Sequence, residues 1–225
     1  MFDIISYLIL AGVGTCVALL VIGHYLNKRS WIVIFKTLAS LGLLAYWFSL
    51  APATTSHYGG LIGLALLFGV IGDVLLLGRK TLLFALGMAA FALGHIIYMI
   101  AFSGFDSSTG SFFAGLLVMW ICGSRVYVWL KPGIAQQLRL PVLLYGGLLT
   151  AMTALALSLR IDQHFTLMGL GALLFMLSDF FVATHRFKTP KLIDKAVGLP
   201  LYYAGQLILA TSIVIQYTQN PWLPV

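Results

Sequence analysis

Two aspartates lie inside apolar stretches of the sequence, where an ionised side chain needs a chemical reason. Asp179 lies in GALLFMLSDFFVATHRF (residues 171–187), and Asp73 ends GLALLFGVIGD (residues 63–73). A carboxylate within a membrane span costs roughly 2.5 to 3.5 kcal/mol on insertion scales, so it usually faces the bundle interior and marks a site. Two carboxylates in one cavity of low dielectric are expected to differ in charge, which suits a general acid and a general base. The alternative is a buried ion pair with Lys36 or Arg125 that only fixes helix packing.

The composition indicates an integral membrane protein. The 225 residues are 61% hydrophobic and 8% charged, with a mean hydropathy of +1.02. A soluble core of this size cannot bury so much apolar surface. The apolar segments are each about 20 residues long, which is the length of a membrane-crossing helix. We therefore predict an all-α, polytopic transmembrane bundle in one domain, residues 1–225, with eight spans at about 4–24, 32–50, 59–77, 82–102, 111–130, 141–159, 164–184 and 198–217. The first is interpreted as a retained span and not as a cleaved signal.

The basic residues predict how the spans are oriented. Twelve of the thirteen Lys and Arg residues lie in or beside the connections that follow spans one, three, five and seven, and Arg160 lies on the other side. The positive-inside rule therefore predicts cytoplasmic positions for these four connections and an external position for both termini. The net charge of +7 is then explained by contact with anionic lipid and not by nucleic acid. A bacterial inner membrane is the expected location.

This topology gives each polar residue a depth. Lys36, Asp73 and Asp179 are expected in the cytoplasmic third of the bundle, together with Tyr202, Tyr203 and Gln206 at the start of span eight. Convergence of such groups in one polar cavity makes buried charges tolerable. His95 and Tyr98 of span four should lie deeper. Purely structural interpretations stay open for some of these residues. His95 could form a hydrogen bond between helices, and Tyr202 and Tyr203 could be aromatic residues at the membrane interface.

Other site chemistries find little support in the sequence. The five histidines have neither HxxxH nor HExxH spacing, so no metal site and no cofactor are predicted. There is no GxSxG elbow and no Cys/His pair for a covalent intermediate. Cys16 and Cys122 fall within spans and are interpreted as small packing residues.

Four short pieces of the sequence form a recognisable pattern in their order and spacing. They are Gly72-Asp73; Gly87, Phe91, His95 and Tyr98; Ser178-Asp179 with Arg186-Phe187; and Tyr202, Tyr203 and Gln206. In this pattern nearly the whole chain resembles the lysoplasmalogenase family, whose members are YhhN-like eight-span membrane hydrolases. One departure from the family pattern is Thr37, which follows Lys36 where the family often has proline.

The resemblance implies hydrolysis of the vinyl ether bond of a lysoplasmalogen, which releases a fatty aldehyde and glycerophosphocholine or glycerophosphoethanolamine. Protonation at carbon gives an oxocarbenium ion that water attacks, and this needs a proton donor and a carboxylate but no metal. Asp73 and Asp179 are the expected catalytic pair, in either order of roles. Lys36 and Arg125 are expected to attract the lipid phosphate. Two rival hypotheses are a small proton- or cation-coupled transporter that uses the same aspartates and a non-catalytic lipid-binding protein.

Overall fold

The computed structural model describes residues 3–160 and 167–219, and within these ranges the chain forms eight long α-helices, three single-turn 3₁₀-helices and no β-strand. All eight helices are long and apolar enough to cross a bilayer. The protein is therefore an all-α integral membrane protein, as the sequence predicts. The long helices are α1 (Ile4–Tyr25), α2 (Arg29–Ser49), α3 (His57–Leu76), α4 (Thr81–Phe102), α5 (Thr109–Leu130), α6 (Arg139–Ser158), α7 (Leu167–Phe187) and α8 (Leu192–Gln219). The short ones are η1 (Ala53–Thr55), η2 (Lys131–Gly133) and η3 (Gln136–Leu138).

The start of α8 differs most from the expected spans. The helix begins at Leu192 and not near residue 198, whereas the other described ends lie within three residues of their expected positions. The Asp194 carboxylate explains the difference. It accepts hydrogen bonds from the backbone N–H of Lys191 at 2.9 Å and from the Thr184 hydroxyl at 3.2 Å, which fixes the first turn of α8 against α7. Residues 164–166, expected in span seven, lie outside the described residues.

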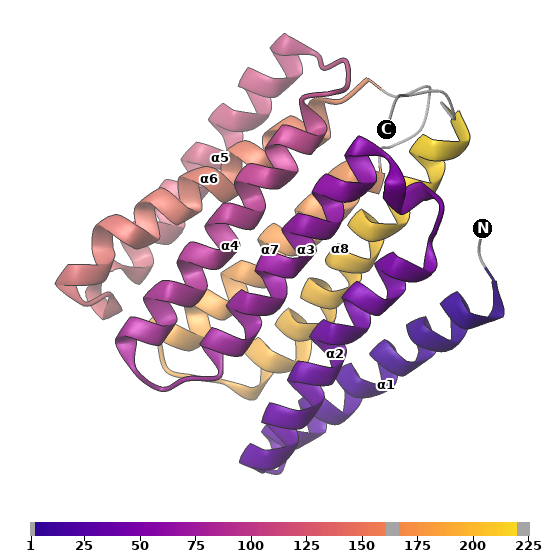
Figure 1. The fold of residues 1–225 in the computed structure, drawn as a ribbon. Helices are drawn as coiled ribbons and strands as arrows, with labels where there is room; N and C mark the ends of the chain where they lie inside the picture. Colours follow the sequence, from indigo (N-terminus) through magenta and orange to yellow (C-terminus); the bar gives the residue numbers. More distant parts are fainter. Residues whose placement is uncertain (1–2, 161–166, 220–225) are drawn as a thin grey trace.

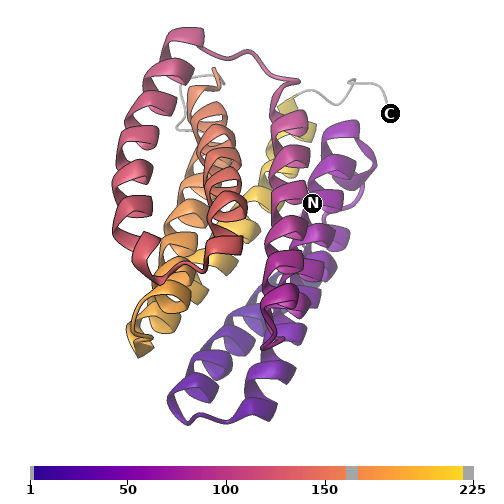
Figure 2. The ribbon, with the colours of Figure 1, turned by 90° about the vertical axis from the view of Figure 1, so that its left-hand side faces the viewer.

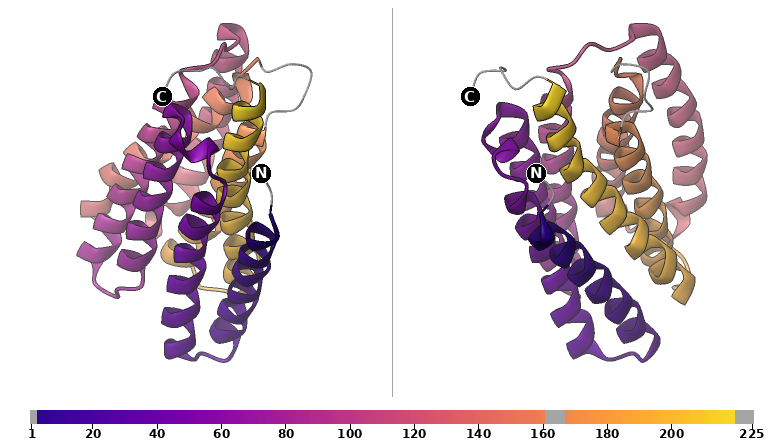
Figure 3. Two further views of the ribbon diagram at one scale, coloured as in Figure 1. Left: turned by 45° about the vertical axis from the view of Figure 1, so that its right-hand side comes forward. Right: turned by 90° about the vertical axis from the view of Figure 1, so that its right-hand side faces the viewer.

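The helices pack mainly as pairs that are neighbours in sequence. Figure 1 shows α1 beside α2, α3 beside α4, and α7 beside α8. Helix α8 also contacts α1, α2 and α3, and the two turned views in Figure 3 show it running between these helices and α7. Figure 2 shows α5 at the outer edge beside α6, and Leu130 is the one buried residue of α5. The centre of the bundle is therefore formed by α3 and α8, with α5 at its periphery.

One end of the bundle carries most of the basic residues. Helices of alternating direction bring the connections after α1, α3, α5 and α7 to the same end, at the lower left of Figure 1. We call this the basic end. Arg160, which follows α6, is exposed at the opposite end. The residues of the basic end are Lys28, Arg29, Arg79, Lys80, Lys131, Arg139, Arg186, Lys188, Lys191 and Lys195.

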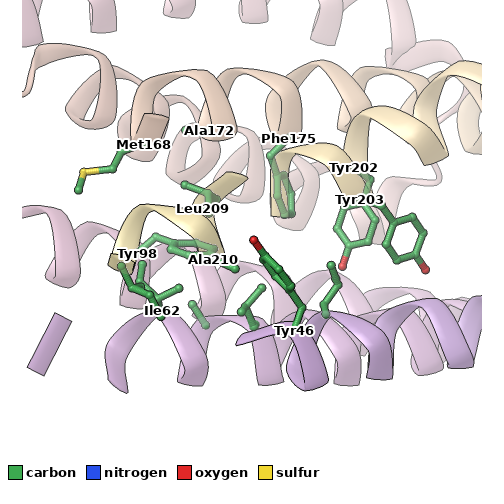
Figure 4. Packing of buried hydrophobic residues seen from close by; sticks show 14 of the residues in the cluster. Tyr46, Ile62, Tyr98, Met168, Ala172, Phe175, Tyr202, Tyr203, Leu209 and Ala210 are labelled. Carbon is green, nitrogen blue, oxygen red and sulfur yellow. The ribbon is translucent and has the colours of Figure 1, made fainter. Parts of the chain in front are cut away.

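The core combines aromatic packing with hydrogen bonds between helices. Figure 4 shows Tyr46, Phe175 and Tyr203 among buried side chains between the α7–α8 pair and the helices facing it. The hydroxyl of Tyr46 lies 2.9 Å from that of Thr211, which links α2 to α8. A bilayer offers little hydrophobic drive for helix association, so packing and such polar contacts hold the helices together.

Two glycines set the spacing between α7 and α8. A Cβ atom added at Gly205 would lie 2.8 Å from the carbonyl oxygen of Gly171 and 3.0 Å from the backbone nitrogen of Phe175. Backbone atoms cannot move aside as a flexible side chain can. The close approach of these helices, and hence the relative position of Asp179 and Tyr202, therefore depends on glycine at this crossing.

We predict that Gly205→Ala destabilises the protein by about 1 to 3 kcal/mol, because overpacking forces the two backbones apart. Gly146→Ala is the matched control, since a Cβ at Gly146 meets nothing within 4 Å. Thermal unfolding of the purified variants in detergent should show a lower midpoint for Gly205→Ala only. An unchanged midpoint for Gly205→Ala would contradict the close approach.

Candidate active site

A cavity of about 380 Å³ lies at the basic end, and its walls come from seven of the eight helices. It brings together four of the nine residues singled out in the sequence, namely Lys36 of α2, Asp73 of α3, Asp179 of α7 and Tyr202 of α8. The two intramembrane carboxylates therefore line the same space. The convergence expected from their common depth is found for these four side chains.

Asp73 is held by three donors from two other helices. Its side chain is buried, and its Oδ1 lies 3.1 Å from the Nζ of Lys36. Its Oδ2 accepts hydrogen bonds from the Ser40 hydroxyl at 2.7 Å and from the Tyr202 hydroxyl at 2.8 Å. An ammonium and two hydroxyls together satisfy an ionised carboxylate away from water.

Tyr203 contacts the residues of α2 that hold Asp73. Its hydroxyl lies 3.0 Å from the Ser40 hydroxyl and 3.3 Å from the carbonyl oxygen of Lys36. Successive tyrosines of α8 thus have different roles, because Tyr202 contacts the carboxylate and Tyr203 contacts the helix that carries its partners. Ser40 was not singled out in the sequence, since a serine in a span carries no distinctive signal.

Asp179 has different surroundings. Its Oδ2 accepts a hydrogen bond from the hydroxyl of Tyr145 on α6. Among the described residues no Lys, Arg or His lies within 4.0 Å of this carboxylate. One aspartate is therefore paired with a cation and the other with a phenol, although both line one cavity. Tyr145 also lines the cavity, and it was not among the residues predicted from the sequence.

An aromatic layer forms the inner wall of the cavity. The ring centroids of Phe91, Phe175 and Tyr202 lie 5.4 to 6.1 Å apart, and the Phe91 and Tyr202 side chains line the space. His95 packs on the far side of this layer, with its ring 5.0 Å from that of Phe175 and 5.2 Å from that of Tyr145. It is buried, and neither ring nitrogen has a hydrogen-bond partner among the described residues.

The remaining residues from the sequence lie outside the cavity walls. The Tyr98 hydroxyl donates to the Oε1 of Gln206 at 2.5 Å, and this buried pair joins α4 to α8. A Cβ at Gly69 would lie 3.1 Å from the Gln206 amide nitrogen and 3.4 Å from the Tyr202 hydroxyl, so glycine leaves room for both. Arg125 is exposed on the peripheral helix α5, away from Lys36.

The cavity walls also carry charged and imidazole side chains that were not among the nine predicted site residues. They lie toward the basic end, where the chain enters or leaves the helices. Because α8 begins six residues earlier than expected, Asp194 and Lys195 belong to its first turn and not to a loop. The described residues contain no group of three or more His, Cys, Asp or Glu arranged to hold a metal ion. The additional charged or imidazole side chains in the walls are His24, Arg29, Arg79, His185, Arg186, Asp194 and Lys195.

Comparison with known proteins shows relatives over most of the chain. The human protein named lysoplasmalogenase TMEM86B is 34% identical over 188 residues, which cover 83% of this chain and 77% of the human one. The bovine lysoplasmalogenase TMEM86A is 31% identical over 171 residues, 72% of this chain and 67% of its own. A membrane protein named YhhN from Escherichia coli O157:H7, described as uncharacterized, is 29% identical over 189 residues, 81% of this chain and 86% of its own. No solved structure matches.

A family match covers most of the chain. Residues 31–213 match the YhhN family, and this range contains all four of the predicted residues that line the cavity. It begins just after the start of α2 and ends near the end of α8, so α1 alone among the eight helices lies outside it. The chain therefore belongs to the YhhN family.

Proposed function

We propose that this protein is a lysoplasmalogenase, a membrane hydrolase that cleaves the vinyl ether bond of an alkenyl-glycerophosphocholine or alkenyl-glycerophosphoethanolamine. The products are a fatty aldehyde and the glycerophospho headgroup. The observation that carries the proposal is the pair of carboxylates in one cavity, one beside an ammonium and one beside a phenol. The names of the human and bovine relatives support the same activity.

Asp179 is the proton donor in this proposal. It has no cationic partner within 4.0 Å among the described residues, and an apolar environment without such a partner favours the uncharged carboxylic acid. The Tyr145 hydroxyl occupies Oδ2, which leaves Oδ1 to carry the proton. Transfer of this proton to the β-carbon of the vinyl ether forms a C–H bond and leaves an oxocarbenium ion.

Asp73 is the general base. In this role its carboxylate, held by the Lys36 ammonium and two hydroxyls, stabilises the nearby cation and takes a proton from the attacking water. The water oxygen bonds to the oxocarbenium carbon and gives a hemiacetal. Asp73 then returns its proton to the glycerol oxygen as the C–O bond breaks, and Asp179 takes the proton of the hemiacetal hydroxyl. Both carboxyl groups end in their starting states.

The other predicted residues shape the site. We propose that Tyr202 and Tyr203 position Asp73, and that Tyr98 and Gln206 hold α4 and α8 together behind the aromatic layer. His95 would support Tyr145 and Phe175 from the far side of this layer and so help to shape the wall that faces the substrate. The basic end faces the cytoplasm of a bacterium, with both termini external, in accordance with the distribution of Lys and Arg.

A proton- or cation-coupled transporter that uses the same aspartates is the second candidate. A carrier must expose its site to both faces of the membrane in turn. The cavity lies at the basic end, and the aromatic layer of Phe91, Phe175 and Tyr202 packs on its inner side. This arrangement favours a reaction at one face of the bilayer. Release of aldehyde from lysoplasmalogen by the purified protein in detergent separates the two functions, since a transporter would release none.

We predict that Asp73→Asn and Asp179→Asn each lower the rate of aldehyde release by at least about 100-fold, because an amide cannot exchange the proton that each step requires. Asp106→Asn, an exposed change in the connection between α4 and α5, is the matched control and should retain activity. Size-exclusion chromatography would verify that each variant is folded. A folded Asp179→Asn variant with near-normal activity would refute the two-carboxylate mechanism.

Lys36→Met should lower kcat by about 10- to 100-fold with a smaller change in KM, because its ammonium contacts the base, and a hydrogen bond to a charged group contributes about 1.5 to 3 kcal/mol. Lys36→Arg keeps the charge and should retain more activity. Arg125→Met, on the exposed face of α5, should alter neither constant. A rise in KM alone for Lys36→Met would show that the ammonium binds substrate and not Asp73.

A further inference from the structure

The part of the cavity nearest the basic end has a strong excess of positive charge. Its wall contains the side chains of Arg29, Arg79, Arg186 and Lys195, and Asp194 is the acidic residue at this level. We call these five residues the cavity mouth. The two deeper carboxyl groups do not pair with the cations of the mouth. Asp73 pairs with Lys36, and among the described residues no Lys, Arg or His lies within 4.0 Å of Asp179. Arg29, Arg79 and Arg186 are exposed, so an anion from outside the protein can reach this excess of positive charge and offset it.

Lys195 is the clearest case at the mouth of an ammonium without an ion-pair partner among the described residues. Its side chain is half-buried in the wall of the cavity. Among the described residues no carboxylate lies within 4.0 Å of its nitrogen. The carboxylate of the neighbouring Asp194 accepts hydrogen bonds from the Thr184 hydroxyl and from the backbone N–H of Lys191. Its Oδ2 also lies 3.5 Å from the Nδ1 of His185. Withdrawing a charge from water without a partner is unfavourable, so this position favours a bound anion.

Two of the arginines are held in place by contacts that leave donors available. The guanidinium of Arg29 donates to the carbonyl oxygen of Leu77 at the end of α3. That of Arg186 lies over the ring of Phe84, 4.5 Å from its centroid. A guanidinium has five N–H donors, so each side chain can still bind anionic oxygens. The cavity mouth is therefore a partly preorganised site for a group with several oxygen acceptors.

We propose that the cavity mouth binds the phosphodiester of the lipid substrate, with Lys195 as the central contact. This rests on the proposed function, and it replaces the expectation that Lys36 and Arg125 hold the phosphate. A phosphodiester carries one negative charge and oxygens that suit both arginine and lysine. When it is bound at the mouth, the glycerol and the vinyl ether extend inward toward Asp73 and Asp179. Binding of the phosphodiester at the mouth thus sets the position of the vinyl ether bond relative to the two carboxyl groups.

Binding of the headgroup alone tests the site without any turnover. The probes are glycerophosphocholine and glycerophosphoethanolamine, added to the purified protein in detergent and followed by calorimetry. We expect at least one of them to bind the wild type and Lys80→Met, and to bind Lys195→Met at least tenfold more weakly. Lys80 is an exposed residue of the same basic end and is not part of the cavity wall. Equal affinity in Lys195→Met and Lys80→Met would overturn the proposal, as would absence of binding to the wild type.

Inorganic phosphate distinguishes a headgroup site from a site for the free ion. We expect it to bind more weakly than the better glycerophospho probe. Tighter binding of inorganic phosphate that depends on Lys195 would overturn the assignment to the lipid headgroup. Arg79→Met is a second variant that does not disturb the core, since Arg79 is exposed, and it should also weaken the glycerophospho probe severalfold. Unchanged binding in this variant would contradict a site formed by the whole mouth.

Kinetics then separate the failure of this site from failure of the proposed function. With lysoplasmalogen as substrate, Lys195→Met should raise KM at least tenfold and change kcat less than twofold, and Lys195→Arg should recover most of the loss. A fall in kcat without a rise in KM would overturn the binding role. If the wild type releases no aldehyde, the proposed function fails, while the calorimetry still decides whether the mouth binds a phosphodiester.

Discussion

The structure depends on providing partners for the buried Asp73 carboxyl group within a membrane-spanning bundle. This requires a cation and hydrogen-bond donors from different helices, and Lys36 and Ser40 of α2 and Tyr202 of α8 provide them. Removing any one partner would leave a buried charge less well compensated. The helices α2, α3 and α8 are therefore fixed relative to one another by the same contacts that prepare the site.

The second carboxyl group, that of Asp179, differs from Asp73 in its partners, and other helices determine these. Asp179 of α7 meets Tyr145 of α6 and no nearby cation among the described residues, while the glycines of α7 and α8 bring these two helices close together. One cavity thus offers two carboxyl groups in distinct environments, which is the usual basis for separate acid and base roles. The proposed phosphodiester site at the mouth would complete this arrangement by fixing the substrate along the axis that leads to both groups.

The sequence predicts the fold and the depth of the site better than it predicts individual contacts. The eight spans follow from hydropathy, and the convergence of Lys36, Asp73 and Asp179 follows from their common depth. Depth does not reveal which way a side chain faces around its helix, so Tyr145 was missed, and Arg125 was expected near a cavity that it does not line. Lys195 was missed for a different reason, because the Asp194 contacts that extend α8 are tertiary and hydropathy cannot detect them.

The most direct test of the central claim is the position of the new hydrogen in the product. Purified protein would be given lysoplasmalogen in D₂O, and the aldehyde would be reduced at once to the alcohol to prevent exchange. Protonation at carbon by a carboxylic acid predicts one deuterium on the carbon adjacent to the former carbonyl carbon in each product molecule. An aldehyde without deuterium at that carbon, or no aldehyde at all, would contradict the account.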